Sequence, residues 1–206
     1  MSTEHVSEAQ AAYGVMDRVS KAVEPWNAAR HWTEEEYLAF DENQLIEFNN
    51  GVVEILPMPS DFHQAISRMI TVLLYILDPL QKLGIARYSP LKVKIPGGKY
   101  REPDILFVLR EHDALRGERF WSGADLVMEI VSPDGEHRDR VEKRLDYAAA
   151  GIAEYWIIDP EIQTITVLKL DGGEYVEHGV FKRGEVATSV LLKGFSVDVT
   201  AIFNAE

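Results

Sequence analysis

The chain has 206 residues, 46% of them hydrophobic and 27% charged, which is the composition of a globular protein with a buried core. It contains no cysteine, so disulfides, thiolate metal sites and cysteine nucleophiles are excluded. The net charge of −13 argues against tight nucleic-acid binding without excluding it, because basic residues still gather in the segments 92–101 and 138–144.

The length fits one domain. We expect residues 31–206 to form that domain, and residues 1–30 to form an N-terminal arm with a short helix. The N-terminus lacks the basic and apolar stretches of a secretion signal, and no apolar run approaches the ~20 residues of a membrane span. These features predict a cytoplasmic protein with no membrane partner.

The domain begins with a helix and a hairpin. Thr33 and Glu36 form a capping-box pattern, which predicts a helix that runs to about Asp41. The apolar runs 45–48 and 52–56 flank an Asn-Gly turn, and Asn-Gly supplies the positive φ angles of a type I′ hairpin turn.

A long helix is predicted after the hairpin. Ser60 is a typical N-cap, while Pro79 and Gly84 mark the end of the helix. Apolar residues recur at spacings of three and four, which predicts the face that packs on the core: Phe62, Ile66, Met69, Ile70, Leu73, Leu74 and Leu77.

The second half of the chain is richer in strands. The pattern predicts strands over 85–95, 105–109, 126–131 and 154–159, a turn at 96–98 and a helix over 136–150. The tail is expected to form an antiparallel meander over 164–170, 174–181 and 186–192. This order predicts an α/β (α+β) domain in which helices flank a mixed β-sheet core, with an N-terminal hairpin and a C-terminal antiparallel meander.

Two carboxylates stand in strands that are otherwise apolar. Asp104 directly precedes the run 105–109, and Glu129 interrupts the run 126–131, where an unpaired buried charge would be costly. If these strands pair as an antiparallel hairpin whose turn is centred between Arg116 and Gly117, Asp104 lies opposite Glu129, with Cβ atoms roughly 4.5–5.5 Å apart. Such a pair requires a cation, or else a proton on one acid, so we predict a divalent metal between hard oxygen ligands.

A lysine could join this pair from the helix over 136–150. Val141, Leu145 and Ala148 form the expected core stripe, and Asp139, Lys143 and Tyr147 share another edge at i, i+4 spacing. That edge could simply be solvated, with an ordinary helix ion pair. However, the short connection 132–135 places the first turns of the helix beside the end of the Glu129 strand, where a lysine can reach a metal-bound water.

Together these motifs resemble the Uma-type family of putative restriction endonucleases, within the PD-(D/E)xK nuclease superfamily. The resemblance covers about residues 37–170 and implies a restriction-endonuclease-like fold, Mg²⁺ or Mn²⁺ as cofactor and DNA as partner. The superfamily places its lysine where this chain has Val131, so the resemblance implies that the lysine has moved to Lys143. The matching segments are Glu47–Glu54, His63, Arg101–Asp104, Glu129–Pro133, Asp139–Lys143, Tyr147 and Gly151–Asp159.

The resemblance also implies roles for single residues. Asp104, Glu129 and Lys143 are the expected catalytic residues, and Asp104, Glu129 and the Ile130 carbonyl the expected metal ligands. Glu54 is an additional candidate ligand because it also interrupts an apolar strand, although it fits an exposed hairpin face equally well.

Four accessory candidates have plain structural alternatives. His63 could bind phosphate or a second ligand, or could be a solvated residue in the first turn of a helix. Arg101 could bind phosphate or could pair with Glu102. Asp139 and Tyr147 lie on the same side of the helix as Lys143, where the tyrosine could serve for packing or hydrogen bonding.

Three functions fit the sequence. The first is a metal-dependent DNA endonuclease that hydrolyses phosphodiester bonds, and the second is a catalytically degenerate nuclease-fold protein that binds DNA or protein. The third is another metal-dependent phosphohydrolase with a small substrate, which is compatible with the negative net charge. A cut in both strands of a duplex requires two active sites, so a homodimer is expected for the first function.

Overall fold

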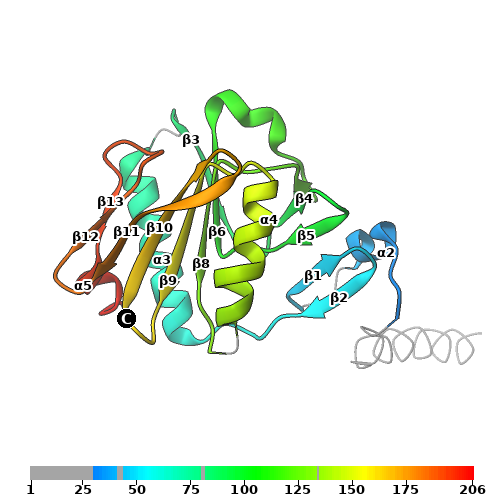
Figure 1. Ribbon diagram of the computed structural model, residues 1–206, viewed down its shortest axis with the longest axis horizontal. Coiled ribbons are helices and arrows are strands. Elements are labelled where there is room, and N and C mark those ends of the chain that lie inside the picture. The colour runs from blue at the N-terminus through cyan, green and yellow to red at the C-terminus, as the bar shows by residue number, and fades with distance from the viewer. Residues whose placement is uncertain (1–29, 41–43, 80–81, 134) are drawn as a thin grey trace, which may run out of the picture.

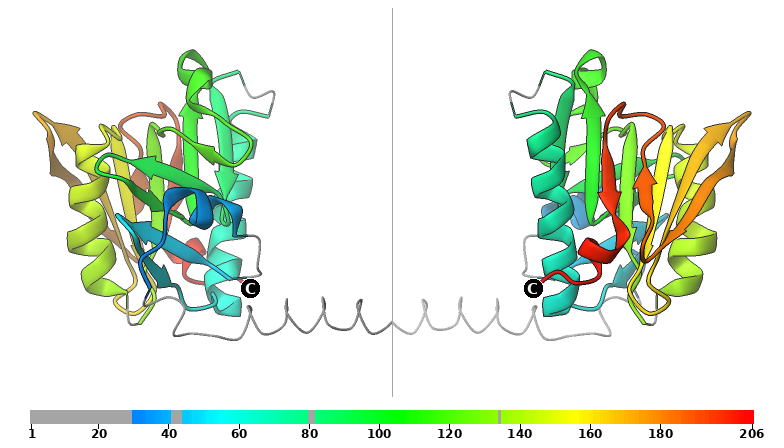
Figure 2. Two further views of the ribbon diagram at one scale, coloured as in Figure 1. Left: turned by 90° about the vertical axis from the view of Figure 1, so that its right-hand side faces the viewer. Right: turned by 90° about the vertical axis from the view of Figure 1, so that its left-hand side faces the viewer.

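The computed structural model describes residues 30–40, 44–79, 82–133 and 135–206, so the arm and short helix expected at 1–30 lie outside the described residues, apart from Arg30. A central sheet carries one long helix on each face (Figure 1, Figure 2). The helices are α2 (Glu34–Ala39), α3 (Asp61–Leu77), the 3₁₀ helix η2 (Arg110–Leu115), the π-helical turn η3 (Arg138–Glu142), α4 (Lys143–Ala149) and α5 (Val199–Ile202).

The strands form one central sheet and two smaller ones. The central sheet has the order β11-β10-β9-β8-β6-β3. Its neighbouring strands are antiparallel, except for the parallel pair β8 and β9. Its strands are β3 (Gly84–Tyr88), β6 (Ile105–Leu109), β8 (Leu126–Ile130), β9 (Glu154–Asp159), β10 (Thr164–Asp171) and β11 (Glu174–Lys182). The second sheet has the order β2-β1-β5-β4-β7, made of β1 (Ile46–Asn49), β2 (Val52–Ile55), β4 (Lys92–Ile95), β5 (Lys99–Arg101) and β7 (Phe120–Trp121). The third pairs β12 (Val186–Thr188) with β13 (Ser196–Asp198). Helices flanking a mixed sheet are the expected fold class.

The local signals of the first half are confirmed. Thr33 and Glu36 form both hydrogen bonds of the capping box at the start of α2. In the hairpin turn, Asn50 and Gly51 have φ angles of 46° and 96°, as a type I′ turn requires. The Ser60 side chain accepts a hydrogen bond from the His63 amide and caps α3.

The alignment of the two acid-bearing strands is also confirmed. β6 and β8 are antiparallel, with Ile105 opposite Met128 and Leu106 opposite Val127, so one further step brings Asp104 opposite Glu129. The connection between the strands is not a simple polar loop, because it contains η2 and β7, and β7 pairs in parallel with β4.

The single strand expected over 85–95 is wrong. This segment forms β3 in the central sheet and β4 in the second sheet, with Ser89 and Pro90 between them. Proline has no amide N–H to donate to a neighbouring strand, so the chain can leave one sheet at this position and enter the other.

The third strand of the expected meander does not join the central sheet. β12 is only three residues long and pairs with β13. The residues after it bend around the buried Glu154 carboxylate, which accepts hydrogen bonds from the Ser189 hydroxyl and from the amides of Val190 and Leu191. These bonds satisfy a buried charge and keep 189–191 out of a strand.

The helix expected over 136–150 forms, but it packs with a different side toward the sheet. Val141 and Leu145, the expected core residues, are 44% and 68% exposed, whereas Lys143 is 2% exposed and Tyr147 is fully buried. The solvated-edge alternative is therefore wrong. The sheet beneath this helix carries buried carboxylates, so charged and hydroxyl groups of the helix are the partners that it needs.

The two faces of the central sheet have separate cores. On one face, α3, α5 and the β12–β13 pair cover alternate strand residues such as Ile105, Met128 and Trp156. On the other face, Leu106 and Val127 pack with Tyr147 of α4 and with Val93 of the second sheet. Asp104 and Glu129 follow the same alternation on this second face, beside the junction with the second sheet.

Candidate active site

Asp104 is held at the start of β6 by the neighbouring strand. Its Oδ2 atom accepts a hydrogen bond of 2.7 Å from the Ile130 amide and lies 3.2 Å from Nε2 of His63. Hydrogen bonding and the negative charge of Asp104 raise the pKa of His63, even though burial of the ring acts in the opposite direction. His63 is thus a partner of Asp104 and not a solvated residue of the first helical turn.

Glu129 lies opposite Asp104 and is 2% exposed. Its Oε1 atom lies 2.9 Å from Nζ of Lys143 and accepts a hydrogen bond from the Tyr147 hydroxyl. Burial raises the pKa of Glu129 to about 8; Lys143 counteracts this effect, and the nearby Asp104 adds to it. Tyr147 is therefore a hydrogen-bond partner that fixes the position of this carboxyl group.

Lys143 places its ammonium group among three carboxylates. Besides Glu129, Nζ lies 3.4 Å from Oε1 of Glu47 and 3.2 Å from Oδ1 of Asp139. Burial alone would lower the pKa of Lys143, but these negative charges raise it, so the side chain remains charged. The lysine of the helix thus points toward the acid pair, as the sequence predicted.

One of these three carboxylates, Glu47, was not among the candidates. It lies in β1, opposite Glu54 of β2, and is 1% exposed. Burial would raise its pKa, but the charges of Lys143 and Arg101 more than offset that effect and lower it. Glu47 interrupts the apolar run 45–48 as Glu54 interrupts 52–56, so the same signal could have found it.

Glu54 stands outside this cluster. Its side chain is about half exposed and accepts a hydrogen bond of 3.1 Å from Nη1 of Arg138. The strand that carries it, β2, lies at the edge of the second sheet, whereas β1 has neighbours on both sides. The exposed-face alternative for Glu54 therefore describes its position.

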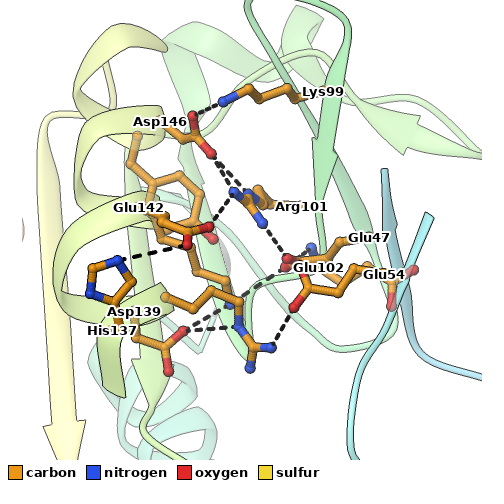
Figure 3. Close-up of polar contacts among 12 residues, drawn as sticks. Glu47, Glu54, Lys99, Arg101, Glu102, His137, Asp139, Glu142 and Asp146 are labelled. Atoms are coloured by element: carbon orange, nitrogen blue, oxygen red, sulfur yellow. Dashed lines mark hydrogen bonds and ion pairs between the residues drawn. The ribbon is translucent and has the colours of Figure 1, made fainter. Parts of the chain in front are cut away.

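Arg101 connects the second sheet to α4 (Figure 3). Its guanidinium lies between Glu47 and Asp146, with Nη1 2.6 Å from Oε2 of Glu47 and Nη2 2.6 Å from Oδ2 of Asp146. Pairing with Glu102 is wrong, because Glu102 lies 3.2 Å from Nζ of Lys92 instead. Only 3% of the Arg101 side chain is exposed, so it supports the neighbouring carboxylates from within the protein.

The acid pair and Lys143 line a cleft of about 730 Å³. Five buried polar atoms of cleft-lining residues have no hydrogen-bond partner within the described part of the chain: Nδ1 of His63, Oε2 of Glu102, Oγ of Ser132, Nε of Arg138 and Oδ1 of Asp139. The last two still have charged neighbours within ion-pair distance. Buried polar atoms are normally paired, so these positions suit water, a cation or a substrate.

The donor atoms at the cleft fit a hard divalent cation by type. Asp104 and Glu129 offer carboxylate oxygens, and the Ile130 carbonyl belongs to a residue that lines the same cleft. Across the described ranges, no three His, Asp or Glu side chains form a preassembled metal site.

Comparisons with known proteins agree with the fold. The solved structure of a "putative nuclease belonging to DUF820" from Anabaena variabilis superposes with a TM-score of 0.70 at 22% sequence identity, covering 84% of this chain and 98% of that one. No curated protein matches by sequence. Within the described residues, no helix is both long and apolar enough to cross a membrane. The family model "Uma2: Putative restriction endonuclease" matches residues 34–200, and the chain therefore belongs to this family.

Proposed function

We propose that this protein is a divalent-metal-dependent DNA endonuclease with a PD-(D/E)xK site whose lysine comes from a helix. One observation carries the proposal: Asp104 and Glu129 stand opposite each other on neighbouring strands, and Nζ of Lys143 lies 2.9 Å from Glu129 beside an open cleft. Membership of the Uma2 family supports the same chemistry.

The reaction is hydrolysis of a phosphodiester. A water oxygen bonds to phosphorus, the bond from phosphorus to one ester oxygen breaks, and a phosphate monoester and a hydroxyl group are released. Asp104, Glu129 and the Ile130 carbonyl would hold Mg²⁺ or Mn²⁺, which when bound activates water and neutralises phosphate charge.

The protein side chains prepare this reaction. The Ile130 amide fixes Asp104, and the Tyr147 hydroxyl fixes Glu129, so both carboxylates are oriented before substrate binds. Lys143 supplies a permanent positive charge beside Glu129, where it stabilises negative charge that develops on the phosphate oxygens. Val131, at the usual lysine position, supplies no charge, so the reaction depends on Lys143.

The test is cleavage of supercoiled plasmid and of labelled oligonucleotides in Mg²⁺, Mn²⁺ or EDTA. The parent should nick DNA only with metal, and Asp104→Asn or Glu129→Gln should reduce the rate at least about 100-fold. Glu177→Gln on β11, an exposed acid away from the cleft, is the control and should cleave normally. Metal-independent DNA binding without cleavage would instead favour the degenerate alternative.

Oligomeric state follows from the substrate. Cutting both strands of a duplex requires two sites, so for that reaction we propose a two-fold homodimer. Sedimentation of the protein with and without DNA measures this, and a monomer that nicks one strand at a time would rule it out.

A further inference from the structure

The mouth of the cleft is apolar, although its floor is charged. Three large apolar side chains that line it are well exposed: Met58 at 73%, Ile162 at 61% and Phe62 at 37%. They come from the link between β2 and α3, the turn after β9 and the first turn of α3. Single exposed apolar residues are common, but three around one candidate active site form a contact surface.

The basic side chains of the cleft are already paired. His63 lies 3.2 Å from Asp104, Arg138 lies 3.1 Å from Glu54, and Lys143 contacts the buried carboxylates. In the described part of the cleft lining, no Lys or Arg remains without an acidic partner. A nucleic acid bound to this lining therefore gains little from phosphate contacts with free cations and has to gain affinity through its bases, which a duplex keeps stacked in its interior.

The size of the cleft points the same way. A volume of about 730 Å³ falls in the range of pockets for small ligands, roughly 300–1,000 Å³. Such a space holds a few separated nucleotides, but it cannot enclose a helical turn of duplex. Exposed bases have apolar faces that stack on aromatic side chains and contact methionine sulfur.

We propose that the cleft binds unpaired nucleotides, with bases against Met58, Phe62 and Ile162 and a backbone phosphate directed to the divalent ion that Asp104 and Glu129 would hold. The substrate class is then single-stranded nucleic acid, or a single-stranded flap or gap in a duplex. This inference rests on the proposed function for its chemistry, but binding tests it separately.

The binding experiment uses fluorescence anisotropy on protein in Ca²⁺, a hard cation that takes the same oxygen ligands. A labelled single strand and a blunt duplex of equal length are titrated at low salt, and the single strand should bind at least about tenfold more tightly. The double variant Met58→Ser, Ile162→Ser should lose about tenfold in affinity for the single strand. The matched control Ile76→Ser, Val180→Ser changes two exposed apolar residues outside the cleft and should bind like the parent.

The cleavage experiment compares a single strand, a flapped duplex and a blunt duplex with bis(4-nitrophenyl) phosphate, a diester that has no bases. The Met58→Ser, Ile162→Ser variant should lose more of its kcat/KM on the single strand than on the small diester. Equal losses on both substrates, or equal cleavage of blunt duplex and single strand by the parent, would overturn the inference.

The two proposals fail in different ways. Selective binding of the single strand with no hydrolysis of any diester supports the inference and overturns the nuclease function. Hydrolysis with no preference for unpaired strands supports the nuclease function and overturns the inference.

Discussion

The helices α3 and α4 cover opposite faces of the same sheet by different means (Figure 2). α3 buries an apolar stripe that includes Ile66, Ile70 and Leu74, as sequence periodicity predicted, but Phe62, also expected in this stripe, is 37% exposed. α4 buries Lys143, Asp146 and Tyr147 and leaves Leu145 exposed to solvent, the reverse of its predicted orientation. The buried charges of α4 lie on the face where we propose the active site.

The two faces also differ energetically. Packing of α3 stabilises the folded state in proportion to the apolar area that it removes from water. Burial of Lys143 removes an ammonium group from water and is tolerated because Glu47, Glu129 and Asp139 surround it. Such buried ion clusters contribute little net stability, so their retention favours a functional reason.

The largest effect is expected for Lys143→Met, which keeps the side-chain length but removes the charge. The change leaves buried carboxylates without their cation and should reduce the free energy of unfolding by about 3–5 kcal/mol. The loss should be greater at pH 9 than at pH 5, because protonated carboxyl groups no longer need the cation. Denaturant unfolding measures both values. An unchanged stability would mean that α4 is held by apolar contacts, as α3 is. The two helices would then not differ in how they pack on the sheet.

Glu129→Gln in EDTA is expected to flatten the dependence of stability on pH. The pKa of Glu129 is raised to about 8 by burial, above the ordinary value near 4.5, so the folded protein binds a proton that the unfolded chain releases. The free energy of unfolding should therefore fall between about pH 5 and pH 8 in the parent. Glutamine mimics the protonated acid, so the variant should gain stability at pH 8, by about 1–3 kcal/mol. A parallel pH profile in both proteins would contradict this origin of the slope.

Ile70→Val is the matching change on the α3 face. It deletes one methylene group from the fully buried stripe and should cost about 0.5–1.5 kcal/mol, with no pH dependence. Cleavage per folded molecule should stay as in the parent, because Ile70 packs on the face opposite the cleft. Thermal unfolding together with plasmid nicking measures both quantities. A loss of activity without a loss of fold would show that the two faces are coupled.

Sequence reasoning predicted the parts of the molecule that depend on local signals. The capping box at Thr33, the Asn-Gly turn and the α3 stripe each follow from residues close together in the chain. The opposition of Asp104 and Glu129 followed from antiparallel pairing about the assumed turn centre between Arg116 and Gly117.

The remaining parts depend on contacts between distant segments. Glu47 and Glu54 give the same signal, and their difference arises only because β5 pairs with β1 and leaves β2 at the edge. The partners of Arg101 lie 45 and 54 residues away in the chain, so no local pattern could have separated them from the adjacent Glu102. The orientation of α4 was missed because Lys143, Asp146 and Tyr147 pair with polar groups of distant segments, and these contacts override hydrophobic periodicity.

The smallest effect is expected for Leu145→Gln on the outer side of α4. Leu145 is 68% exposed, so the change removes little buried apolar area and should alter the free energy of unfolding by no more than about 0.5 kcal/mol. Cleavage should also be unchanged, since the buried edge with Lys143 and Tyr147 is untouched. The matched change Tyr147→Phe, on that buried edge, should lower activity because Glu129 loses its hydroxyl partner.

A fall of several degrees in Tm for Leu145→Gln, together with a smaller sedimentation coefficient, would place this leucine in an interface between copies of the chain. The exposed side of α4 would then be an apolar contact surface, and the contrast with α3 would hold only for the isolated chain.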